Sequence, residues 1–347
     1  EVARLVLQAN IAGVHAQREY RRFYPVGELT SQVVGLTNLD GKGIAGIELA
    51  FDEWLSGVQG KKRFIKDLHG EAVRDFGAII QPRPGRDIAL SLDLRLQYVQ
   101  HRELKKAIAE TRATSVSAIT LDSWTGEILA VSNYPTFNPN NRGRMNYANV
   151  RNRAMTDLFE PGSTIKTFTI VAALESKKFN VDTIVDTSPG HILVGKKLLH
   201  DPRDYGKLSV SQVFERSSQV GVTKIAKVIG HNHILNVFNR FGLGEPTGTG
   251  FPGERTGVLP DSGSKGQIDR VTLAFGYGIS ATPIQLARAY AVFANEGQLL
   301  PLSLIKQETT ERINGDQIIS KAIASDMINL LARAVTSEGT GALAQVP

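Results

Sequence analysis

The pattern of apolar and polar positions after residue 87 predicts a series of helices. Asp93 is well placed to cap a helix that begins at Leu94 and ends near Thr111. Thr282 followed by Pro283 is typical of a helix start, because proline needs no amide hydrogen in the first turn. That helix is predicted to span Thr282–Ala294. The other predicted helices are Ser163–Ser176, Ser209–Arg216, Gln219–Ile229, His233–Phe241 and Lys321–Val335.

Strands are predicted at two places in the same region. The short apolar run at residues 88–92 favours a strand, and it lies directly before the first predicted helix. Ser117–Asp122 and Glu127–Ser132, on either side of a Ser-Trp-Thr-Gly turn, predict a β-hairpin. Strands that flank many helices indicate an α+β fold or a mixed three-layer domain.

The clearest break in the chain is Gln81–Arg86, which holds two prolines and a glycine in six residues. Such a composition suits neither a helix nor a central strand, so we interpret this stretch as a linker. Before it, short apolar runs punctuated by glycines predict small strands and turns. We therefore expect two domains, residues 1–86 and 87–347, and a chain of 347 residues is long enough to give each a core.

Composition narrows the functional classes. The net charge is +6, but the basic residues are scattered apart from the short clusters Arg18–Arg22 and Lys61–Lys66, which favours a solvated basic surface over a nucleic-acid site. The absence of cysteine excludes thiol catalysis and zinc–thiolate sites, and the histidines show no metal-ligand spacing. No run approaches the roughly 20 apolar residues of a membrane helix, and no signal peptide opens the chain. We expect any natural membrane anchor to lie outside this sequence.

The candidate chemistry begins at the start of the helix predicted from Ser163. Pro161 and Gly162 turn the chain there, and the free amide groups of the first helical turn could stabilise an oxyanion. Lys166 follows three residues later, so its side chain lies on the same face as Ser163. A neutral lysine amine could remove the serine proton if its surroundings favour that form. A plain helix cap beside a surface lysine remains an equal alternative at this point.

The same Ser-x-x-Lys spacing occurs twice more, at Ser262–Lys265 and Ser303–Lys306. The first of these lies in a glycine-rich loop and the second in a strand-like run, so neither is oriented by a helix. A different polar group, Ser217-Ser218-Gln219, interrupts a helical pattern about fifty residues after Ser163. It could relay a proton and hold a substrate amide, or simply cap the next helix.

Together these segments resemble the penicillin-binding proteins. Glu160-Pro161-Gly162-Ser163-Thr164-x-Lys166 is similar to the first active-site motif of that family, whose Ser-x-x-Lys signature is well described. Ser217-Ser218-Gln219 falls where the family has Ser-x-Asn. Further similar segments run along nearly the whole chain, and their spacing most resembles the division-specific class B enzymes of Gram-negative bacteria, the penicillin-binding protein 3 group: Tyr24–Gly27, Gly43–Gly57, Thr125–Ala130, Tyr134–Asn140, Arg151–Arg153, Phe241–Gly244, Phe251–Arg255, Gly276–Gly278 and Thr282–Ala287.

The resemblance implies a fold, a reaction and a set of partners. It implies a serine β-lactamase-like transpeptidase domain, with an antiparallel sheet flanked by helices, and an N-terminal pedestal domain that is incomplete at its start. It implies that Ser163 is the acylated nucleophile, Lys166 the base in acylation, Ser217 a proton relay and Gln219 a contact for the substrate amide. The implied substrates are peptidoglycan stem peptides and β-lactams, with no cofactor, no metal and no nucleic acid. The implied partners are a membrane glycan polymerase and other division proteins, at the periplasmic face of an inner membrane to which an N-terminal helix anchors the protein.

Two departures from the family pattern leave alternatives open. Gln219 stands where the family usually has Asn, which moves the amide by one methylene. The family's Lys-Thr/Ser-Gly strand is expected just after Pro347, so the sequence is expected to be a fragment whose chemistry belongs to the complete molecule. A β-lactamase-related hydrolase shares Ser-x-x-Lys but has no use for residues 1–86. A non-catalytic β-lactam-binding sensor or scaffold is the other alternative.

Overall fold

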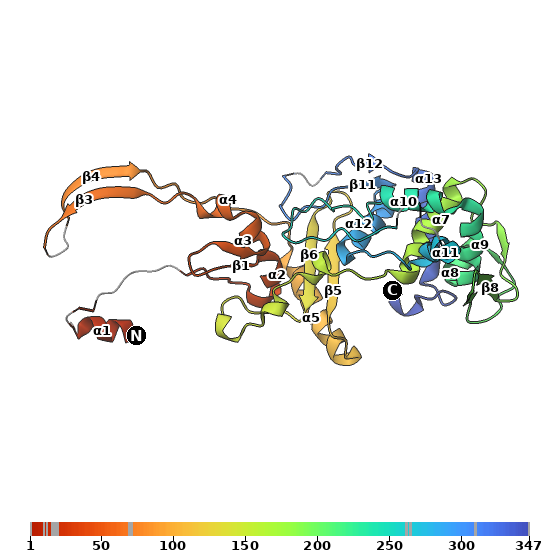
Figure 1. Ribbon diagram of the computed structural model, residues 1–347, viewed down its shortest axis with the longest axis horizontal. Coiled ribbons are helices and arrows are strands. Elements are labelled where there is room, and N and C mark those ends of the chain that lie inside the picture. The colour runs from red at the N-terminus through yellow and green to blue at the C-terminus, as the bar shows by residue number, and fades with distance from the viewer. Residues whose placement is uncertain are drawn as a thin grey trace.

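The computed structural model describes residues 2–9, 11, 13–14, 21–68, 72–260, 263, 266–308 and 311–345. The molecule is elongated (Figure 1): a hairpin of β3 (Lys61–Lys66) and β4 (Ala72–Ile80) lies at one end and a mainly helical region at the other. A second hairpin, of β5 (Val116–Leu121) and β6 (Ile128–Tyr134), lies between them. Within the described residues no helix combines the length and apolarity that crossing a bilayer requires.

The N-terminal part is built from short elements, but the prediction of small strands and turns is only partly confirmed, because among the described residues short helices are more numerous here than the strands. Tyr24 is its structural centre: the Tyr24 hydroxyl accepts a hydrogen bond from the Thr37 amide at 3.1 Å, and Tyr24 itself is buried. The carboxamide of Asn140 pairs with both backbone polar groups of Tyr24, at 3.0 and 2.8 Å, which joins this part to the rest of the chain. Its elements are α1 (Val2–Gln8), η1 (Gly27–Leu29), α2 (Ser31–Val34), β1 (Leu36–Thr37), β2 (Gly43–Ala45), α3 (Gly46–Ala50) and α4 (Asp52–Ser56).

The predicted β-hairpin is confirmed as β5 (Val116–Leu121) paired antiparallel with β6 (Ile128–Tyr134). The helices α5 (Leu94–Thr111) and α12 (Pro283–Ala294) pack against this hairpin, so the fold is α+β with helices flanking antiparallel strands. The strand predicted at residues 88–92 is reduced to one bridge, Leu90 to Ile305, because only a short extended run of the chain lies beside it. Ser303, in the third Ser-x-x-Lys copy, belongs to that run and accepts the Ile128 amide through its carbonyl.

Local sequence signals fixed the helix limits well. Asp93 accepts the Arg95 amide and caps α5, whose bounds match the prediction. Thr282 and Gln285 form a reciprocal capping box at the start of α12, which also matches. The helix predicted from Ser163 is different at its start, because residues 162–165 form a tighter 3₁₀ turn, η4 (Gly162–Ile165), before α7 (Lys166–Glu175).

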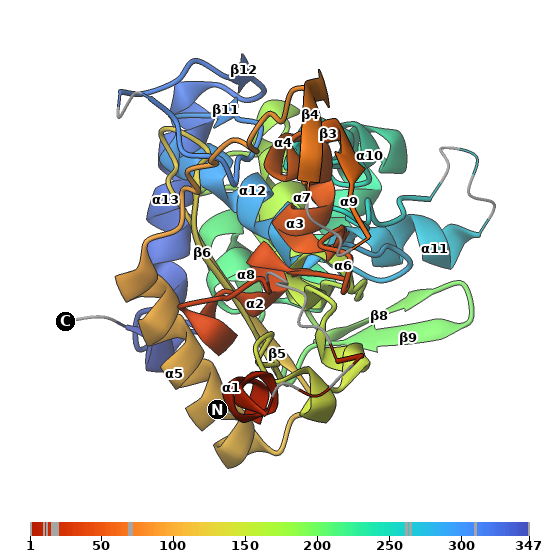
Figure 2. The same ribbon diagram turned by 90° about the vertical axis from the view of Figure 1, so that its left-hand side faces the viewer.

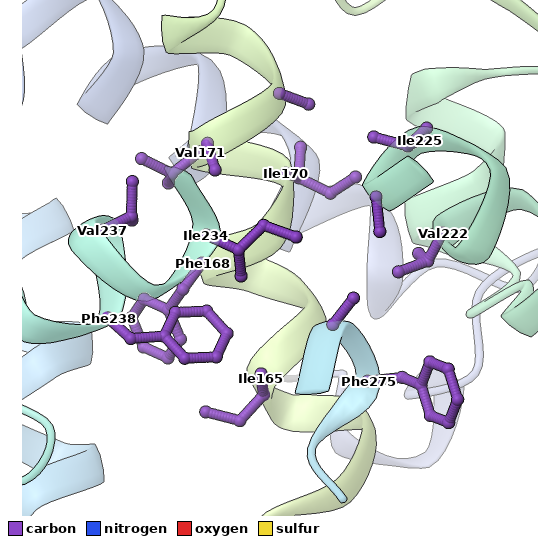
Figure 3. Packing of buried hydrophobic residues seen from close by; sticks show 14 of the residues in the cluster. Ile165, Phe168, Ile170, Val171, Val222, Ile225, Ile234, Val237, Phe238 and Phe275 are labelled. Atoms are coloured by element: carbon purple, nitrogen blue, oxygen red, sulfur yellow. The ribbon is translucent and has the colours of Figure 1, made fainter. Parts of the chain in front are cut away.

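The main core surrounds α7, whose side chains are nearly all buried (Figure 3). Phe168 lies at its centre, with ring centroids of Phe241 and Tyr290 at 4.8 and 5.4 Å. Ile234, Val237 and other apolar residues of α10 (His231–Arg240) close the core on one side, and those of α9 (Gln219–Ile229) on another. This packing holds α7, and with it the segment that carries Ser163, rigidly in the middle of the helical region.

The remaining elements complete the helical region. Figure 2 shows the hairpin of β8 (His191–Val194) and β9 (Lys197–His200) extending on the side of the molecule away from α5. The other elements are η2 (Arg142–Arg144), η3 (Tyr147–Asn149), α6 (Arg153–Thr156), β7 (Ile184–Asp186), β10 (Lys207–Ser209), α8 (Val210–Glu215), α11 (Gln267–Thr272), η5 (Leu273–Phe275), β11 (Gln298–Leu299), β12 (Asp316–Gln317), α13 (Lys321–Ala334) and η6 (Ala342–Ala344).

Candidate active site

Ser163 lies on the 3₁₀ turn that leads into α7, and it is exposed to solvent. Gly162 before it has a φ of 57°, a left-handed conformation that glycine adopts without strain. The Thr164 hydroxyl donates to the Pro161 carbonyl at 2.7 Å, which closes the turn. An accessible hydroxyl is therefore held on a well-defined turn at the entrance to a buried helix.

The segment in front of Ser163 is held by a second strand-like segment from far along the chain. Phe159 and Ala281 exchange backbone hydrogen bonds at 3.1 Å, and the Gly278 amide donates to the Glu160 carboxylate at 3.0 Å. Gly276 approaches most closely: a Cβ there would lie 2.1 Å from the Gly162 carbonyl oxygen, so only glycine fits. These contacts fix the position of the turn that carries Ser163.

Lys166 is the first residue of α7, and it is buried even though it carries an amine. Its Nζ donates to the Ser217 carbonyl at 2.5 Å and to the Ser217 hydroxyl at 2.9 Å. Burial lowers the pKa of Lys166 from 10.5 to about 8, while the nearby charge of Asp201 acts in the opposite direction. The amine is therefore close to the pKa range in which a base works near neutral pH.

Ser217 lies in the short turn between α8 and α9 and has a φ of 53°. This left-handed conformation is unusual for serine, and it coincides with a carbonyl and a hydroxyl that both accept from Lys166. Ser218 behind it caps α9 and is fully buried. Ser217 therefore binds Lys166, whereas Ser218 caps α9.

Asp201 is a member of the site that sequence reasoning missed. It is buried, its carboxylate accepts the Ser218 hydroxyl at 2.6 Å, and it accepts the amides of Gln219 and Val220 at 2.6 and 3.2 Å. It therefore anchors the start of α9 and places a negative charge near Lys166. A single acidic residue gives no local signal of these contacts, because they form only where the end of β9 packs against α9.

Ser163, Lys166, Ser217 and Gln219 line one hollow of about 300 Å³. The side chain of Gln219 makes no hydrogen bond to any part of the chain that the structure describes, so its amide is free to bind a ligand. Six further residues complete the wall: Gly162, His200, Asp201, Pro202, Phe275 and Tyr277. An exposed hydroxyl, a buried amine, a second hydroxyl and a free carboxamide converge here, which suits acyl transfer through a serine.

Two larger hollows lie elsewhere, and neither contains Ser163. One, of about 770 Å³, lies beside Trp54 and Arg86; the other, of about 710 Å³, lies at the start of α10. The hollow of about 300 Å³ is the better candidate because it contains the exposed Ser163 and the Lys166 amine with its lowered pKa. Among the described residues, no three His, Asp or Glu side chains are grouped so as to hold a metal ion.

The Ser-x-x-Lys copy at Ser303–Lys306 does not form a comparable site. The hydroxyl of Ser303 donates to the Ile305 carbonyl at 2.8 Å, and the Lys306 amide binds the Ala89 carbonyl within the extended run. Of the copy at residues 262–265, only Gly263 lies among the described residues.

Comparison with known proteins gives consistent results over the whole chain. Residues 116–347 match the family described as penicillin binding protein transpeptidase domain, and residues 1–90 match the penicillin-binding protein dimerisation domain. The chain is 39% identical to the probable peptidoglycan D,D-transpeptidase PbpC of Pseudomonas aeruginosa, covering 99% of this chain and 60% of that protein. It is 35% identical to the peptidoglycan D,D-transpeptidase FtsI of Escherichia coli K12, covering 100% of this chain and 58% of that protein.

Solved structures of similar proteins share the fold. The crystal structure of penicillin-binding protein 3 from Mycobacterium tuberculosis, in complex with aztreonam, is 30% identical with a TM-score of 0.82. The match covers 94% of this chain and 73% of that one. The chain spans about three fifths of the length of the PbpC and FtsI proteins named above.

Proposed function

Since this chain belongs to the penicillin-binding protein transpeptidase family, we propose that the complete protein is a peptidoglycan D,D-transpeptidase that cross-links stem peptides during septal cell-wall synthesis. The observation that carries the proposal is the Lys166 amine. It is buried, its pKa is lowered to about 8, and it lies in the same hollow as the exposed Ser163. A base of this kind is what a serine nucleophile needs.

In the acylation step, the Ser163 hydroxyl attacks the carbonyl carbon of the penultimate D-Ala of a stem peptide. The neutral Lys166 amine takes the hydroxyl proton, and the bond between that carbonyl carbon and the nitrogen of the terminal D-Ala breaks. Ser217 accepts a hydrogen bond from Lys166, so it can relay a proton to the departing nitrogen. Free D-Ala leaves, and the stem remains as an ester on Ser163.

In the second step, an amine from a neighbouring stem attacks the ester carbonyl. The new amide is the cross-link, and the Ser163 oxygen leaves and regains a proton. Gln219 holds the amide of the bound stem, since it lines the hollow and its carboxamide offers both a donor and an acceptor. β-Lactams acylate the same hydroxyl by opening of their ring, and the adduct is released slowly.

We propose the same two-domain division as the sequence suggested. Residues 1–86 are the pedestal and residues 87–347 belong to the transpeptidase domain. The stretch Gln81–Arg86 is exposed and belongs to no helix or strand, which supports a boundary there. On the resemblance to division-specific enzymes, we further propose that the protein works at the periplasmic face of the inner membrane, anchored by a helix outside residues 1–347, beside a membrane glycan polymerase and other division proteins.

Labelling of the full-length protein with a fluorescent penicillin tests the proposal. We expect one adduct per chain on Ser163, and a Ser163→Ala variant that forms none. Ser303→Ala is the matched control, because it removes the serine of another Ser-x-x-Lys copy and should label normally. Labelling that survives Ser163→Ala would contradict the assignment. Rapid release of hydrolysed penicillin would indicate a β-lactamase, and stable labelling without cross-linking of stem peptides would indicate a sensor.

A further inference from the structure

We infer that Tyr290 is a positioning residue for the acyl-transfer reaction, and that its hydroxyl holds the turn that carries Ser163. The inference rests on the function proposed above. Tyr290 lies on α12, 127 residues after Ser163 in the sequence, and it does not line the hollow. It acts on the nucleophile only through the backbone and side chains on either side of it.

The Tyr290 hydroxyl contacts both ends of the first turn of the nucleophile helix. It donates to the Thr164 carbonyl at 2.8 Å, and it lies 2.8 Å from the Thr167 hydroxyl. Because Tyr290 has one hydroxyl proton, the Thr167 hydroxyl is the donor in the second bond. A chain of two hydrogen bonds therefore runs from Thr167 through Tyr290 to Thr164, directly beside Ser163.

The surroundings make this hydroxyl rigid. The Tyr290 ring packs edge-on against Phe168, with centroids 5.4 Å apart, and against Phe293 at 6.0 Å. Burial raises the pKa of Tyr290, so the hydroxyl stays protonated and remains a donor. A threonine in the first turn of a helix often bonds the carbonyl four residues before it, which for Thr167 is that of Ser163. Here Thr167 bonds Tyr290 instead.

The turn that carries Ser163 needs support from outside the helix. Residues 162–165 form a 3₁₀ turn and not regular α-helix, and a 3₁₀ turn has poorer hydrogen-bond geometry. Thr164 also closes this turn through its hydroxyl, which donates to Pro161 at 2.7 Å. Tyr290 binds the carbonyl of the same residue, so a second hydrogen bond, from a distant helix, holds this turn. Small errors in the direction of a nucleophile reduce reaction rates strongly.

The test is Tyr290→Phe in the full-length protein, which removes the hydroxyl and keeps the ring that packs on Phe168. We expect the rate constant of acylation by a fluorescent penicillin to fall about tenfold, with the dissociation constant of the initial complex unchanged within about twofold. The midpoint of the pH–rate profile should not move, because Tyr290 does not contact Lys166. Thr167→Val, which removes the donor to Tyr290, should show part of the same loss.

Tyr24→Phe is the matched control. It also removes a hydrogen-bonded hydroxyl, but in the N-terminal part, and it should leave the acylation rate constant unchanged. Comparable acylation by Tyr290→Phe and the wild type would overturn the inference while leaving the proposed function intact. An equal loss in Tyr24→Phe would also overturn it, since the effect would then come from general destabilisation. A wild-type protein that forms no adduct would overturn the proposed function and this inference together.

Discussion

Replacing Asp201 by Asn tests directly what sets the pKa of Lys166, the proposed base. The substitution removes one negative charge and keeps a side chain of the same shape, whose Oδ1 can still accept the amides of Gln219 and Val220. The charge of Asp201 favours the ammonium form of Lys166 and so opposes the effect of burial. Without it, the pKa of Lys166 should fall below its value of about 8 in the wild type.

The magnitude for the wild type follows from the pKa itself. Lowering the pKa of Lys166 from 10.5 to about 8 raises the neutral fraction near pH 7 about 300-fold over that of an ordinary lysine. The neutral fraction then rises about tenfold between pH 7 and pH 9. Since the neutral amine is the active form, the acylation rate should increase with pH and level off above the pKa.

The assay is the rate of acylation by a fluorescent penicillin, measured by rapid mixing over a pH range that brackets the pKa. We expect a midpoint near pH 8 for the wild type and a lower midpoint for Asp201→Asn. The midpoint is the diagnostic quantity, because the plateau rate also reflects the geometry of Gln219. A wild-type midpoint near 10.5, or an Asp201→Asn midpoint at or above the wild-type value, would refute this account of the base.

Three further predictions follow from the same geometry. Lys166→Met should raise the free energy of unfolding in urea by about 1 kcal/mol at neutral pH. The substitution removes a burial cost of about 3 kcal/mol for the ammonium, but it also removes hydrogen bonds to Ser217 that stabilise the fold by about 2 kcal/mol. The Lys166 pKa is depressed in the fold, so the burial cost disappears as pH rises from about 8 to 10.5, and the variant should become less stable than the wild type at the upper end of this range. Gln219→Asn withdraws the carboxamide by one methylene, so it should lower the preference for benzylpenicillin over 6-aminopenicillanic acid, which lacks the acyl amide, by about fivefold in acylation rates. Gly276→Ala should slow penicillin acylation at least about tenfold, because its Cβ would meet the Gly162 carbonyl, whereas Gly278→Ala, with open space at its Cβ, should slow it less.

Each of these predictions has an opposite outcome that would count against it. A Lys166→Met protein less stable than the wild type at neutral pH would mean that burying the ammonium costs less than its hydrogen bonds to Ser217 contribute. An unchanged ratio between the two penicillins in Gln219→Asn would mean that residue 219 does not contact the acyl amide. Equal rates for the two glycine variants would mean that the contact between Gly276 and Gly162 does not position Ser163.

Local sequence determined much of the helical framework and indicated the first pair of candidate site residues. Asp93 and Thr282 mark helix starts because a cap acts on amides two or three residues away, and both caps are formed as expected. The spacing of Ser163 and Lys166 also follows from local geometry, and the two line the same hollow. The family motifs along the chain then favoured one interpretation of that pair over a simple helix cap.

The tertiary structure decided the features that depend on contacts between distant segments. Lys166 bonds Ser217, which is 51 residues away, and the burial that lowers its pKa comes from packing that no local pattern describes. The contacts of Asp201 and Tyr290 were likewise invisible, since a single polar residue carries no information about its partners in the fold. The predicted strand at residues 88–92 was wrong for the same reason: strand formation requires a neighbour, and the chain supplies only a short one. Helix limits depend on interactions between residues a few positions apart. Strand pairing, the burial of a charge and the position of Ser163 depend on the distant segments that pack against them.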